Sequence, residues 1–210
     1  MRLAIIGAGN VGKGLGGAAV KAGHDVTISS RNAEHYSESA KAIGAKAAGT
    51  ADAVRDAEVV VLAIPADSIV DTGRSLASHV GGKILVDVSN RVNPGEPGSV
   101  LDGSSVSEKL QAAVPDARVV KAFNTLFAST YADPAPSGQV RDAYVAGDDD
   151  VAKASVLELA GSLGFRPIDM GPLAVARVLE GMALCNILLQ IRNGWPWQSG
   201  FKLIGPTGET

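Results

Sequence analysis

A short apolar strand followed by a glycine-rich turn opens this chain, and this pair restricts the fold more than any other sequence feature. The apolar run LAII (3–6) leads into GAGNVGKG (7–14), in which Gly7, Gly9 and Gly12 have the spacing G-x-G-x-x-G. In a strand–turn–helix unit the first glycine permits a tight turn and the second lets the backbone approach a pyrophosphate, while the third allows close helix–strand packing. The pattern predicts a dinucleotide-binding loop at the start of a helix over roughly 11–22.

The same stretch nearly fits a second phosphate-binding pattern. Gly7 to Lys13 reads G-x-x-x-x-G-K. A P-loop needs a serine or threonine after the lysine to bind Mg²⁺, and here that position is Gly14. The nearby apolar run VVVLAIP also ends without an aspartate that could serve as a metal partner. These differences exclude the triphosphate interpretation, and Lys13 is then expected to be a solvated helix residue.

Apolar runs rich in valine and isoleucine recur along most of the chain, each followed by a break and a helix-like segment. After the first run they cover 25–29, 58–64, 83–88, 118–123 and 142–147. Short, continuously apolar runs are typical of strands that are buried on both faces of a parallel sheet. Their alternation with helices predicts an α/β fold of Rossmann type, with a doubly wound, mostly parallel sheet.

The end of the second strand bears on which dinucleotide is bound. A site for NAD places Asp or Glu there to bond the ribose 2′-OH, whereas this chain has Ser29, Ser30 and Arg31. Two hydroxyls and a guanidinium form an anion pocket, and arginine can hold a 2′-phosphate with two parallel hydrogen bonds. We therefore expect NADP(H), with His35 one helical turn beyond Arg31 and within reach of the same phosphate. In the alternative interpretation Ser30 caps the next helix and Arg31 is solvated.

The pattern of the chain changes near residue 148. DDDVAKASVLELAGSLG reads as a helix, FRPIDMGP as a short strand and turn, and LAVARVLEGMALCNILLQIRN as a long apolar helix. We expect an NADP-binding Rossmann domain over 1–147. A small helical C-terminal portion over 148–210 would close the active site and supply a dimer contact.

The ends of the later strands should line the crevice that receives the nicotinamide. Asparagine and threonine there are suited to hold its carboxamide, and Ile64 and Phe123 to pack on its ring, although ordinary turn chemistry explains Pro65 and Asn90 equally well. The predicted cofactor-binding residues are therefore Gly7, Gly9, Asn10, Val11, Gly12, Ser29, Ser30, Arg31, His35, Ala63, Ile64, Pro65, Ser89, Asn90, Phe123, Asn124 and Thr125.

No catalytic residue is identified, because no Ser-His-Asp set, Tyr-x-x-x-Lys pair or paired-carboxylate site stands out. Hydride transfer to a keto acid usually needs a general acid, whereas transfer between two ring cofactors relies mainly on stacking and orientation. Lys121 and Asp169 are the only acid candidates, and Asp169 is expected to be buried against Arg166 or Arg177.

No metal site is expected either. The acids of GDDD (147–150) suit the first turn of a helix, and no His or Cys cluster accompanies them. His24 and His79 are expected in surface turns, and Cys185 in the core.

Composition narrows the range of partners. The 210 residues are 46% hydrophobic with a formal net charge of −3, so nothing indicates nucleic acid or an anionic membrane. One cysteine excludes an internal disulfide framework. LAII is too short for a signal peptide, and no apolar run approaches the length of a membrane span. We expect a soluble, cytoplasmic protein that acts on a small-molecule cofactor.

With these pieces together, the chain resembles the family of coenzyme F420-dependent NADP oxidoreductases, and the oxidoreductase domains of the STEAP metalloreductases share the same fold. The resemblance runs nearly end to end and includes MRLAIIGAGNVGKGL, SSR, VVKAFNT, AGDDD, LGFRPIDMGPLAVARVLEGMALCNILLQIRN and GFKLIG. The last long block is the most specific, because it lies outside the generic Rossmann half.

The resemblance implies a Rossmann domain with a short helical C-terminal portion. It also implies NADP(H) held by the glycine loop, Ser30 and Arg31, with His35 where family members can carry a basic residue. Two departures bear on the second substrate. The glycine loop is one residue shorter than the GGTGN form of the archaeal enzymes, and KAFNT is closer to the metalloreductase branch. NADP binding is therefore better supported than F420 use.

The expected function is hydride transfer between NADP(H) and a second ring cofactor, with coenzyme F420, a deazaflavin, as the first candidate and a flavin as the next. The apolar C-terminal helix favours a homodimer. Trp195 and Trp197 mark either a stacking surface for the second ring or a dimer contact. Two alternatives stay open: an NADPH-dependent imine or carbonyl reductase, and a non-catalytic NADP(H)-sensing protein.

Overall fold

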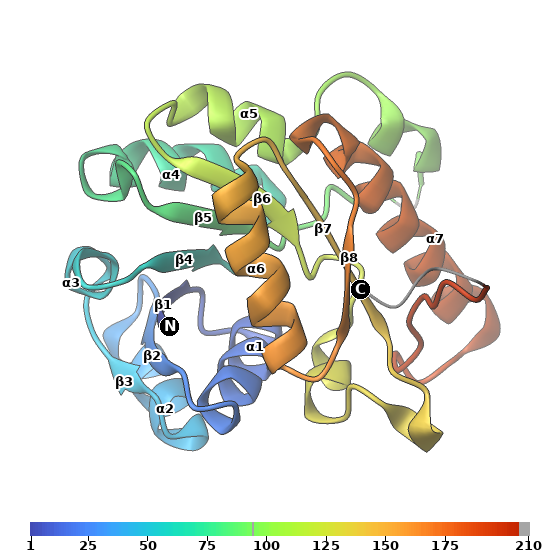
Figure 1. The fold of residues 1–210 in the computed structure, drawn as a ribbon, viewed down its shortest axis with the longest axis horizontal. Helices are drawn as coiled ribbons and strands as arrows, with labels where there is room; N and C mark the ends of the chain where they lie inside the picture. Colours follow the sequence, from blue (N-terminus) through green and yellow to red (C-terminus); the bar gives the residue numbers. More distant parts are fainter. Residues whose placement is uncertain (94, 206–210) are drawn as a thin grey trace.

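A single mixed sheet runs through the computed structural model, which describes residues 1–93 and 95–205 (Figure 1). Its strands are β1 (Arg2–Ile6), β2 (Asp25–Ser29), β3 (Lys46–Ala47), β4 (Val59–Leu62), β5 (Ile84–Asp87), β6 (Arg118–Ala122), β7 (Asp142–Gly147) and β8 (Arg166–Asp169). The helices are α1 (Asn10–Lys21), α2 (Ala33–Ile43), α3 (Thr50–Arg55), α4 (Ala66–Val80), α5 (Val106–Ala113), α6 (Asp150–Ser162) and α7 (Ala176–Asn193). Single 3₁₀ turns are η1 (Pro97–Leu101), η2 (Ala128–Ala132), η3 (Pro136–Gly138) and η4 (Leu173–Val175).

The strand order is β3-β2-β1-β4-β5-β6-β7-β8, and every neighbouring pair is parallel except β6 and β7. The predicted doubly wound, mostly parallel sheet is therefore confirmed. The chain builds outward from β1 to β2 and β3, then crosses to β4 on the other side of β1. At such a reversal of strand order the connections diverge, so a crevice opens at the carboxyl ends of β1 and β4.

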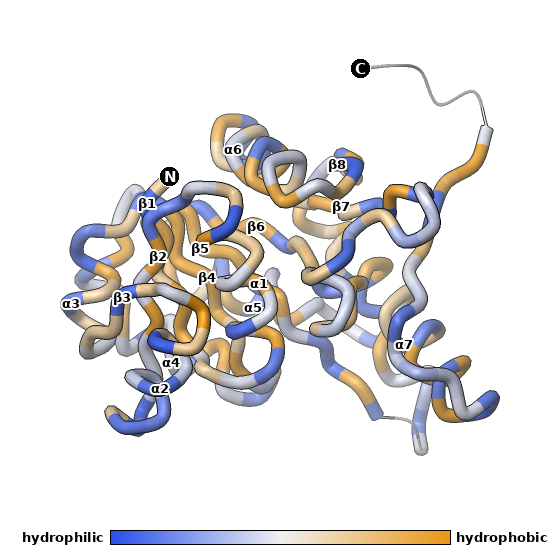
Figure 2. The backbone as a smooth tube through the Cα atoms, turned by 90° about the horizontal axis from the view of Figure 1, so that it is seen from below, coloured by the Kyte–Doolittle hydropathy of each residue, from blue (hydrophilic) through white to orange (hydrophobic). Residues whose placement is uncertain are grey.

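Alternate residues of each strand face opposite layers, because strand side chains have a period of two. In β1, Leu3 and Ile5 pack in a core with α1, α2 and α6, whereas Ala4 and Ile6 pack in a second core with α3, α4 and α5. Burial on both faces accounts for the continuously apolar runs in the sequence. Figure 2 shows the strands as the hydrophobic interior and places most hydrophilic residues in the outer turns and helices.

The segment after residue 147 contributes to the same sheet. Helix α6 begins at the predicted acidic stretch, and Asp149 caps it by accepting a 2.7 Å hydrogen bond from the Ala152 N–H. Strand β8 then pairs in parallel with β7. Helix α7 closes a third, smaller core with Tyr144, Ala146 and Leu179. The C-terminal portion therefore supplies an edge strand as well as helices.

The chain beyond α7 returns to the start of β7. The buried Asp142 carboxylate accepts 2.7 Å hydrogen bonds from Nε and Nη2 of Arg166 and a 2.6 Å bond from the Leu203 N–H. Burial alone would raise the pKa of the Asp142 carboxyl, but the hydrogen bonds from Arg166 and Leu203 and the Arg166 charge hold that pKa below its usual range. This carboxylate fastens the C-terminal segment to the sheet.

The expectation that no apolar run approaches the length of a membrane span is wrong. Residues Leu173–Asn193, which form η4 and α7, are long and apolar enough to cross a membrane by length and composition alone. In the structure this helix buries the polar side chains of Glu180, Asn186 and Gln190 against the rest of the chain. Such burial is typical of a helix that packs on protein.

Candidate functional site

The glycine loop connects β1 to α1 in the conformation that its spacing predicts. Gly7 has a φ of +124°, which side-chain-bearing residues rarely adopt, and a Cβ there would lie 2.1 Å from the Ala63 carbonyl oxygen. A Cβ on Gly12 would lie 1.9 Å from the Gly7 carbonyl oxygen, so α1 can pack this closely on the loop only with glycine at that position. Both residues are needed for the geometry of the turn itself.

Gly9 has a different role. A Cβ built on Gly9 meets no atom within 4 Å, and the residue lines a cavity. Gly9 is also the N-cap of α1 and makes no side-chain cap, so the first N–H groups of the helix have no partner among the residues that the structure describes. A side chain on Gly9 would fill the space in front of these donors. That space fits a pyrophosphate, which binds at a helix N-terminus through such N–H groups and the helix dipole.

The cavity beside the loop measures about 900 Å³, a size within the range of small-molecule and cofactor sites. Its walls come from the glycine loop, the turn after β2, the start of α3, the end of β4 and one face of α4. The lining residues are Ile6, Gly7, Gly9, Ser30, Arg31, Asn32, His35, Thr50, Ala51, Ala63, Ile64, Pro65, Asp67, Ser68, Asp71, Thr72, Ser75, Leu76 and His79.

Eight of the predicted cofactor-binding residues line this one cavity: Gly7, Gly9, Ser30, Arg31, His35, Ala63, Ile64 and Pro65. Three others, Asn10, Val11 and Gly12, form the first turn of α1 immediately behind the loop. Ser29 is fully buried beneath the cavity, and its Oγ lies 3.0 Å from Oγ1 of Thr50, which does line it.

The turn after β2 presents a free cation to the cavity. Arg31 is exposed, and no hydrogen bond or ion pair joins it to any other residue that the structure describes. Ser30 does not cap the next helix. Its Oγ donates to the Asn32 carbonyl oxygen at 3.1 Å, and Asn32 is the N-cap of α2. Residues 30–32, directly after β2, include no carboxylate, so this end of the cavity suits an anion.

The opposite wall belongs to α4 and was not predicted from the sequence. Asp67, Asp71 and Ser75 of this helix line the cavity, and so does His79, which lies in the last helical turn instead of a surface turn. The sequence signal that could have identified this wall is the position of α4 directly after β4, because the helix that follows a strand at the reversal of strand order borders the crevice.

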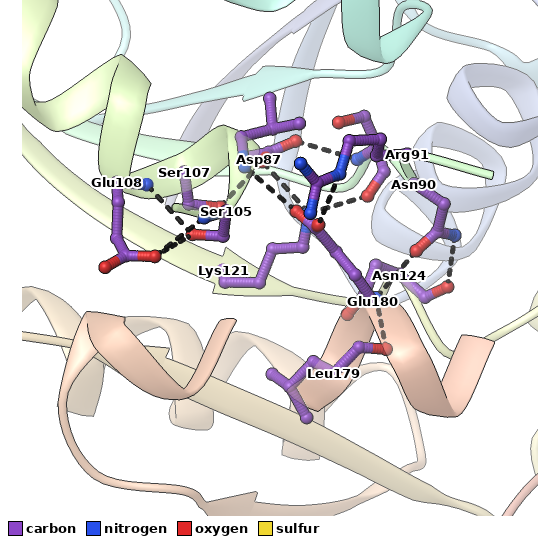
Figure 3. Close-up of polar contacts among 12 residues, drawn as sticks. Asp87, Asn90, Arg91, Ser105, Ser107, Glu108, Lys121, Asn124, Leu179 and Glu180 are labelled. Carbon is purple, nitrogen blue, oxygen red and sulfur yellow. Dashed lines mark hydrogen bonds and ion pairs between the residues drawn. The ribbon is translucent and has the colours of Figure 1, made fainter. Parts of the chain in front are cut away.

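The remaining predicted residues lie at the carboxyl ends of β5 and β6, outside the lining of this cavity. Asn90 and Asn124 bond to each other, with Asn124 Nδ2 donating to Asn90 Oδ1 at 2.8 Å and also to the Leu179 carbonyl oxygen at 2.9 Å (Figure 3). Within this group of predicted residues, three buried polar atoms have no hydrogen-bond partner among the described residues: Ser89 Oγ, Asn124 Oδ1 and Thr125 Oγ1.

Unpaired polar atoms at the ends of two neighbouring strands fit a ligand with an amide or hydroxyl group, since a buried polar group without a hydrogen bond is costly. Phe123, which lies between the end of β6 and Asn124, has a φ of +62° and is almost fully buried. A non-glycine residue in this conformation stores strain, and such strain clusters at functional sites.

Beneath this group, an ion cluster joins the strands to α7 (Figure 3). Lys121, Asp87 and Glu180 are all 0% exposed. Lys121 Nζ lies 3.0 Å from Asp87 Oδ2 and 3.5 Å from Glu180 Oε1, and donates to the Ser89 carbonyl oxygen at 2.6 Å. Lys121 therefore connects β5, β6 and α7 and holds the turn that carries Ser89.

The two carboxyls of the cluster respond differently to burial. Burial works to raise the pKa of Asp87, but the Lys121 charge and the hydrogen bonds from the Ser107 hydroxyl and the Ser89 backbone N–H outweigh it and hold that pKa below its usual range. Burial is also the largest influence on Glu180, and here it prevails: the pKa of Glu180 is raised despite Lys121 and the hydrogen bond from the Val106 N–H. Glu180 is the carboxyl of this cluster that protonates first.

Two predictions about single residues are wrong. Asp169 is exposed and lies 3.5 Å from Lys153 Nζ instead of pairing with Arg166 or Arg177. Those two arginines pair with Asp142 and Glu108. Cys185 is exposed on α7 and lines a second cavity instead of the core.

No group of three or more potential metal ligands occurs among residues 1–93 and 95–205. The acids of GDDD have local roles: Asp149 caps α6, and Asp148 Oδ1 accepts a 2.8 Å hydrogen bond from the Leu173 N–H.

Comparison with known proteins identifies a family to which this chain is similar. Residues 2–91 match the sequence model described as NADP oxidoreductase, coenzyme F420-dependent. An F420-dependent NADP reductase of Methanothermobacter marburgensis is 32% identical over 213 residues, with 92% of this chain and 94% of that protein covered. Metalloreductase STEAP3 of Rattus norvegicus is 34% identical over 87% of this chain, which spans 36% of that protein's length.

Solved structures give the same result. A protein from Arthrobacter sp. FB24, provisionally described as an F420-dependent NADP reductase, superposes with a TM-score of 0.83 at 31% identity, covering 98% of this chain and 100% of that one. An imine reductase from Bacillus cereus superposes with a TM-score of 0.62 at 17% identity, covering 92% of this chain and 60% of that one. The second likeness shows a shared fold.

Proposed function

The chain belongs to the family of coenzyme F420-dependent NADP oxidoreductases, and from this premise we propose that it transfers a hydride between NADP(H) and a second ring cofactor, coenzyme F420 ahead of a flavin. The observation that carries the cofactor choice is Arg31, a cation beside the glycine loop that pairs with no described residue and stands where an NAD site would have a carboxylate. When bound, NADPH supplies the hydride. The chain's own contribution is to bind and orient both partners.

The residues have separate tasks in this proposal. The open backbone at Gly9 and the first N–H groups of α1 would hold the pyrophosphate, and Arg31 and Ser30 the 2′-phosphate. Ile64 lines the cavity near the strand ends and would pack on the nicotinamide. The unpaired Ser89 Oγ, Asn124 Oδ1 and Thr125 Oγ1 would bond its carboxamide.

A ring cofactor as the second substrate is supported by the state of the two acid candidates. Lys121 is 0% exposed and fully engaged with Asp87, Glu180 and Ser89, so it cannot touch a substrate as a proton donor. Asp169 faces solvent beside Lys153. A ring that spreads the transferred charge needs orientation more than a positioned acid.

We also propose that the protein forms a homodimer through α7. Val178, Leu189 and Ile191 of this helix are 47%, 40% and 56% exposed, and Trp195 just beyond it is 46% exposed. The second cavity, about 350 Å³, lies on the same helix and is lined mainly by apolar side chains of α7 and η1. An apolar surface of this kind on a helix is typical of a subunit contact.

The acceptor is tested by anaerobic oxidation of NADPH in the presence of F420, FMN, FAD, a ferric chelate or a cyclic imine, followed through nicotinamide absorbance. Turnover with F420 supports the proposal, and turnover with FMN or FAD alone supports the flavin form. Turnover only with the ferric chelate or the imine contradicts the ring-cofactor assignment. Tight NADPH binding without turnover of any acceptor identifies a sensor instead. The Gly9→Val variant, which blocks the pyrophosphate position, is the control for turnover at this site.

A further inference from the structure

Ser89, just after β5, is held by the ion cluster through its backbone. Its N–H donates to Asp87 Oδ1 at 2.8 Å, and its carbonyl oxygen accepts from Lys121 Nζ at 2.6 Å. Lys121 Nζ also donates to Asp87 Oδ2 at 3.0 Å, which closes a ring of hydrogen bonds (Figure 3). This ring, the Ser89 clamp, uses the backbone N–H and carbonyl of Ser89. The buried Ser89 Oγ, which has no partner among the described residues, is left for a ligand.

The clamp is also fixed from outside the sheet. A lysine ammonium has three N–H donors. Two of them serve the clamp, and Lys121 Nζ also lies 3.5 Å from Glu180 Oε1 of α7. Glu180 Oε1 in turn accepts a 3.1 Å hydrogen bond from the Val106 N–H at the start of α5. The orientation of the ammonium is therefore set by α7 and α5 as well as by β5.

Stability does not account for a lysine at this position. Its neighbours in β6, Val119, Val120 and Ala122, are apolar and buried. Exchanging a whole buried ion pair for well-packed apolar side chains is often neutral or stabilising. What Lys121 supplies, and an apolar side chain would not, is a hydrogen-bond donor for the Ser89 carbonyl oxygen.

A second residue with an unpaired polar atom is held by the same segment of α7. Asn124 Nδ2 donates to the Leu179 carbonyl oxygen at 2.9 Å, and Leu179 directly precedes Glu180 in the helix. Consecutive residues of α7 therefore position both strand ends, Asn124 directly and Ser89 through Lys121.

We propose that Lys121 is a positioning residue for the nicotinamide: through the Ser89 clamp it fixes the Ser89 hydroxyl against the carboxamide and so holds the ring in the orientation that hydride transfer requires, without touching the cofactor. The inference rests on the proposed function, which assigns the carboxamide to Ser89, Asn124 and Thr125. Groups that touch a ligand keep their geometry only where further hydrogen bonds support them. A misplacement of about 1 Å can slow a reaction about 100-fold.

The proposal separates orientation of the ring from binding of the dinucleotide. The phosphate contacts proposed at Gly9 and Arg31 belong to the glycine loop and the turn after β2, whereas the clamp joins β5 and β6. Lys121→Met should therefore weaken NADPH binding by no more than about threefold. The nicotinamide ring, in contrast, should gain local motion on the nanosecond timescale.

Ring motion is measured without any acceptor, from the fluorescence anisotropy decay of the reduced nicotinamide in bound NADPH. In the wild type we expect the ring to rotate only with the whole protein. Lys121→Met and Ser89→Ala should each add a fast component, and the double variant should add no more than Ser89→Ala alone, because Lys121 acts through Ser89. Lys109→Met, the same replacement at an exposed position of α5, is the control and should match the wild type.

The same variants are compared in a single turnover with F420 as acceptor and NADPH bound at saturation. We expect the rate constant of hydride transfer to fall about 10- to 100-fold in Lys121→Met. In the Ser89→Ala background, the additional Lys121→Met replacement should cause no further fall.

A further variant separates positioning from stability, because Lys121→Met also affects folding. Lys121→Met/Glu180→Gln removes one buried negative charge, and a glutamine there retains an oxygen for the Val106 N–H. Its melting temperature should recover part of the loss, whereas the ring should remain mobile. If the ring becomes immobile again as stability returns, Lys121 has a structural role only and the inference is overturned.

The inference is also overturned if the ring is as immobile in Lys121→Met as in the wild type, if it is mobile in the wild type itself, or if Lys121→Met slows transfer equally with and without the Ser89 hydroxyl. A wild type that immobilises the ring but reduces no acceptor would refute the proposed hydride transfer and leave the positioning role intact. A wild type that does not bind NADPH would refute both.

Discussion

At the scale of single residues, the choice between NADP and NAD rests on Arg31. Its guanidinium is exposed at the rim of the cavity and has no partner among the described residues. We expect Arg31→Ala to weaken NADPH binding by about 10- to 100-fold, because a hydrogen bond between charged groups contributes about 1.5–3 kcal/mol. NADH binding should be unchanged. Equilibrium titrations with both nucleotides check this, with Arg31→Lys as the matched control for charge. An equal loss of affinity for NADPH and NADH would mean that Arg31 has a structural role only.

A second prediction concerns Gly9 and Gly12: a substitution at Gly9 should affect NADPH binding, whereas one at Gly12 should affect stability. Gly9 has a φ of −77°, which any residue adopts, and open space around its Cβ position. Gly9→Val should therefore melt near the wild-type temperature and lose NADPH affinity by about 100-fold or more, a change of at least ~2.7 kcal/mol. Gly12→Ala should lower the melting temperature, because its Cβ meets the Gly7 carbonyl oxygen. Calorimetric melting measures the effect on stability, and NADPH titration measures the effect on affinity. A Gly9→Val protein with normal NADPH affinity would contradict the assignment of the pyrophosphate position.

The residue scale also shows what local sequence can predict. The three glycines and Ser30-Arg31 were found because their spacing from β1 and β2 is fixed along the chain. The partner of Lys121 was not, since Glu180 lies 59 positions away and only the packing of α7 brings it to β6. Asp169 was misassigned for the same reason: which arginine meets which carboxylate depends on tertiary contacts.

At the scale of elements, the ion cluster couples α7 to the ends of β5 and β6. We expect Lys121→Met to lower the free energy of unfolding by about 3–5 kcal/mol, because the buried Asp87 loses its cation and the buried Glu180 keeps only the more distant Arg91, 3.8 Å away. Urea unfolding measures this. Lys109→Met, an exposed change on α5, should cost less than about 0.5 kcal/mol.

The pH dependence of this variant has a defined sign. The pKa of Glu180 is raised by burial, so this carboxyl takes up a proton as pH falls and one uncompensated charge disappears. The stability difference between Lys121→Met and the wild type should therefore shrink toward acidic pH, and Glu180→Gln added to Lys121→Met should restore part of the loss. A deficit that grows as pH falls would contradict this account.

The bounds of the strands could be predicted from the sequence more accurately than the exposure of side chains on α7. The strands over 25–29 and 142–147 have the predicted bounds, because apolar runs that end at turn residues mark strands directly. The exposure of Cys185 was missed, since α7 is apolar on faces that the chain does not cover, and periodicity alone does not say which face is buried.

At the scale of the whole molecule, the uncovered face of α7 predicts the oligomeric state. We expect light scattering coupled to size exclusion to give twice the chain mass, and Leu189→Glu, which puts a charge on this exposed face, to give the monomer. Val151→Glu, a 68% exposed apolar residue on α6, should leave the mass unchanged. A monomeric wild type, or a dimer that persists in Leu189→Glu, contradicts an interface on α7.

The whole account depends on direct hydride transfer between two bound ring cofactors. The most direct measurement uses NADPH deuterated at C4, in separate 4R and 4S preparations, with F420 as acceptor and mass spectrometry of the reduced product. The account predicts that one of the two preparations delivers a single deuterium to F420, since the chain holds both rings in one orientation. Reduced F420 that contains only hydrogen from both preparations, or no reduction at all, would contradict it.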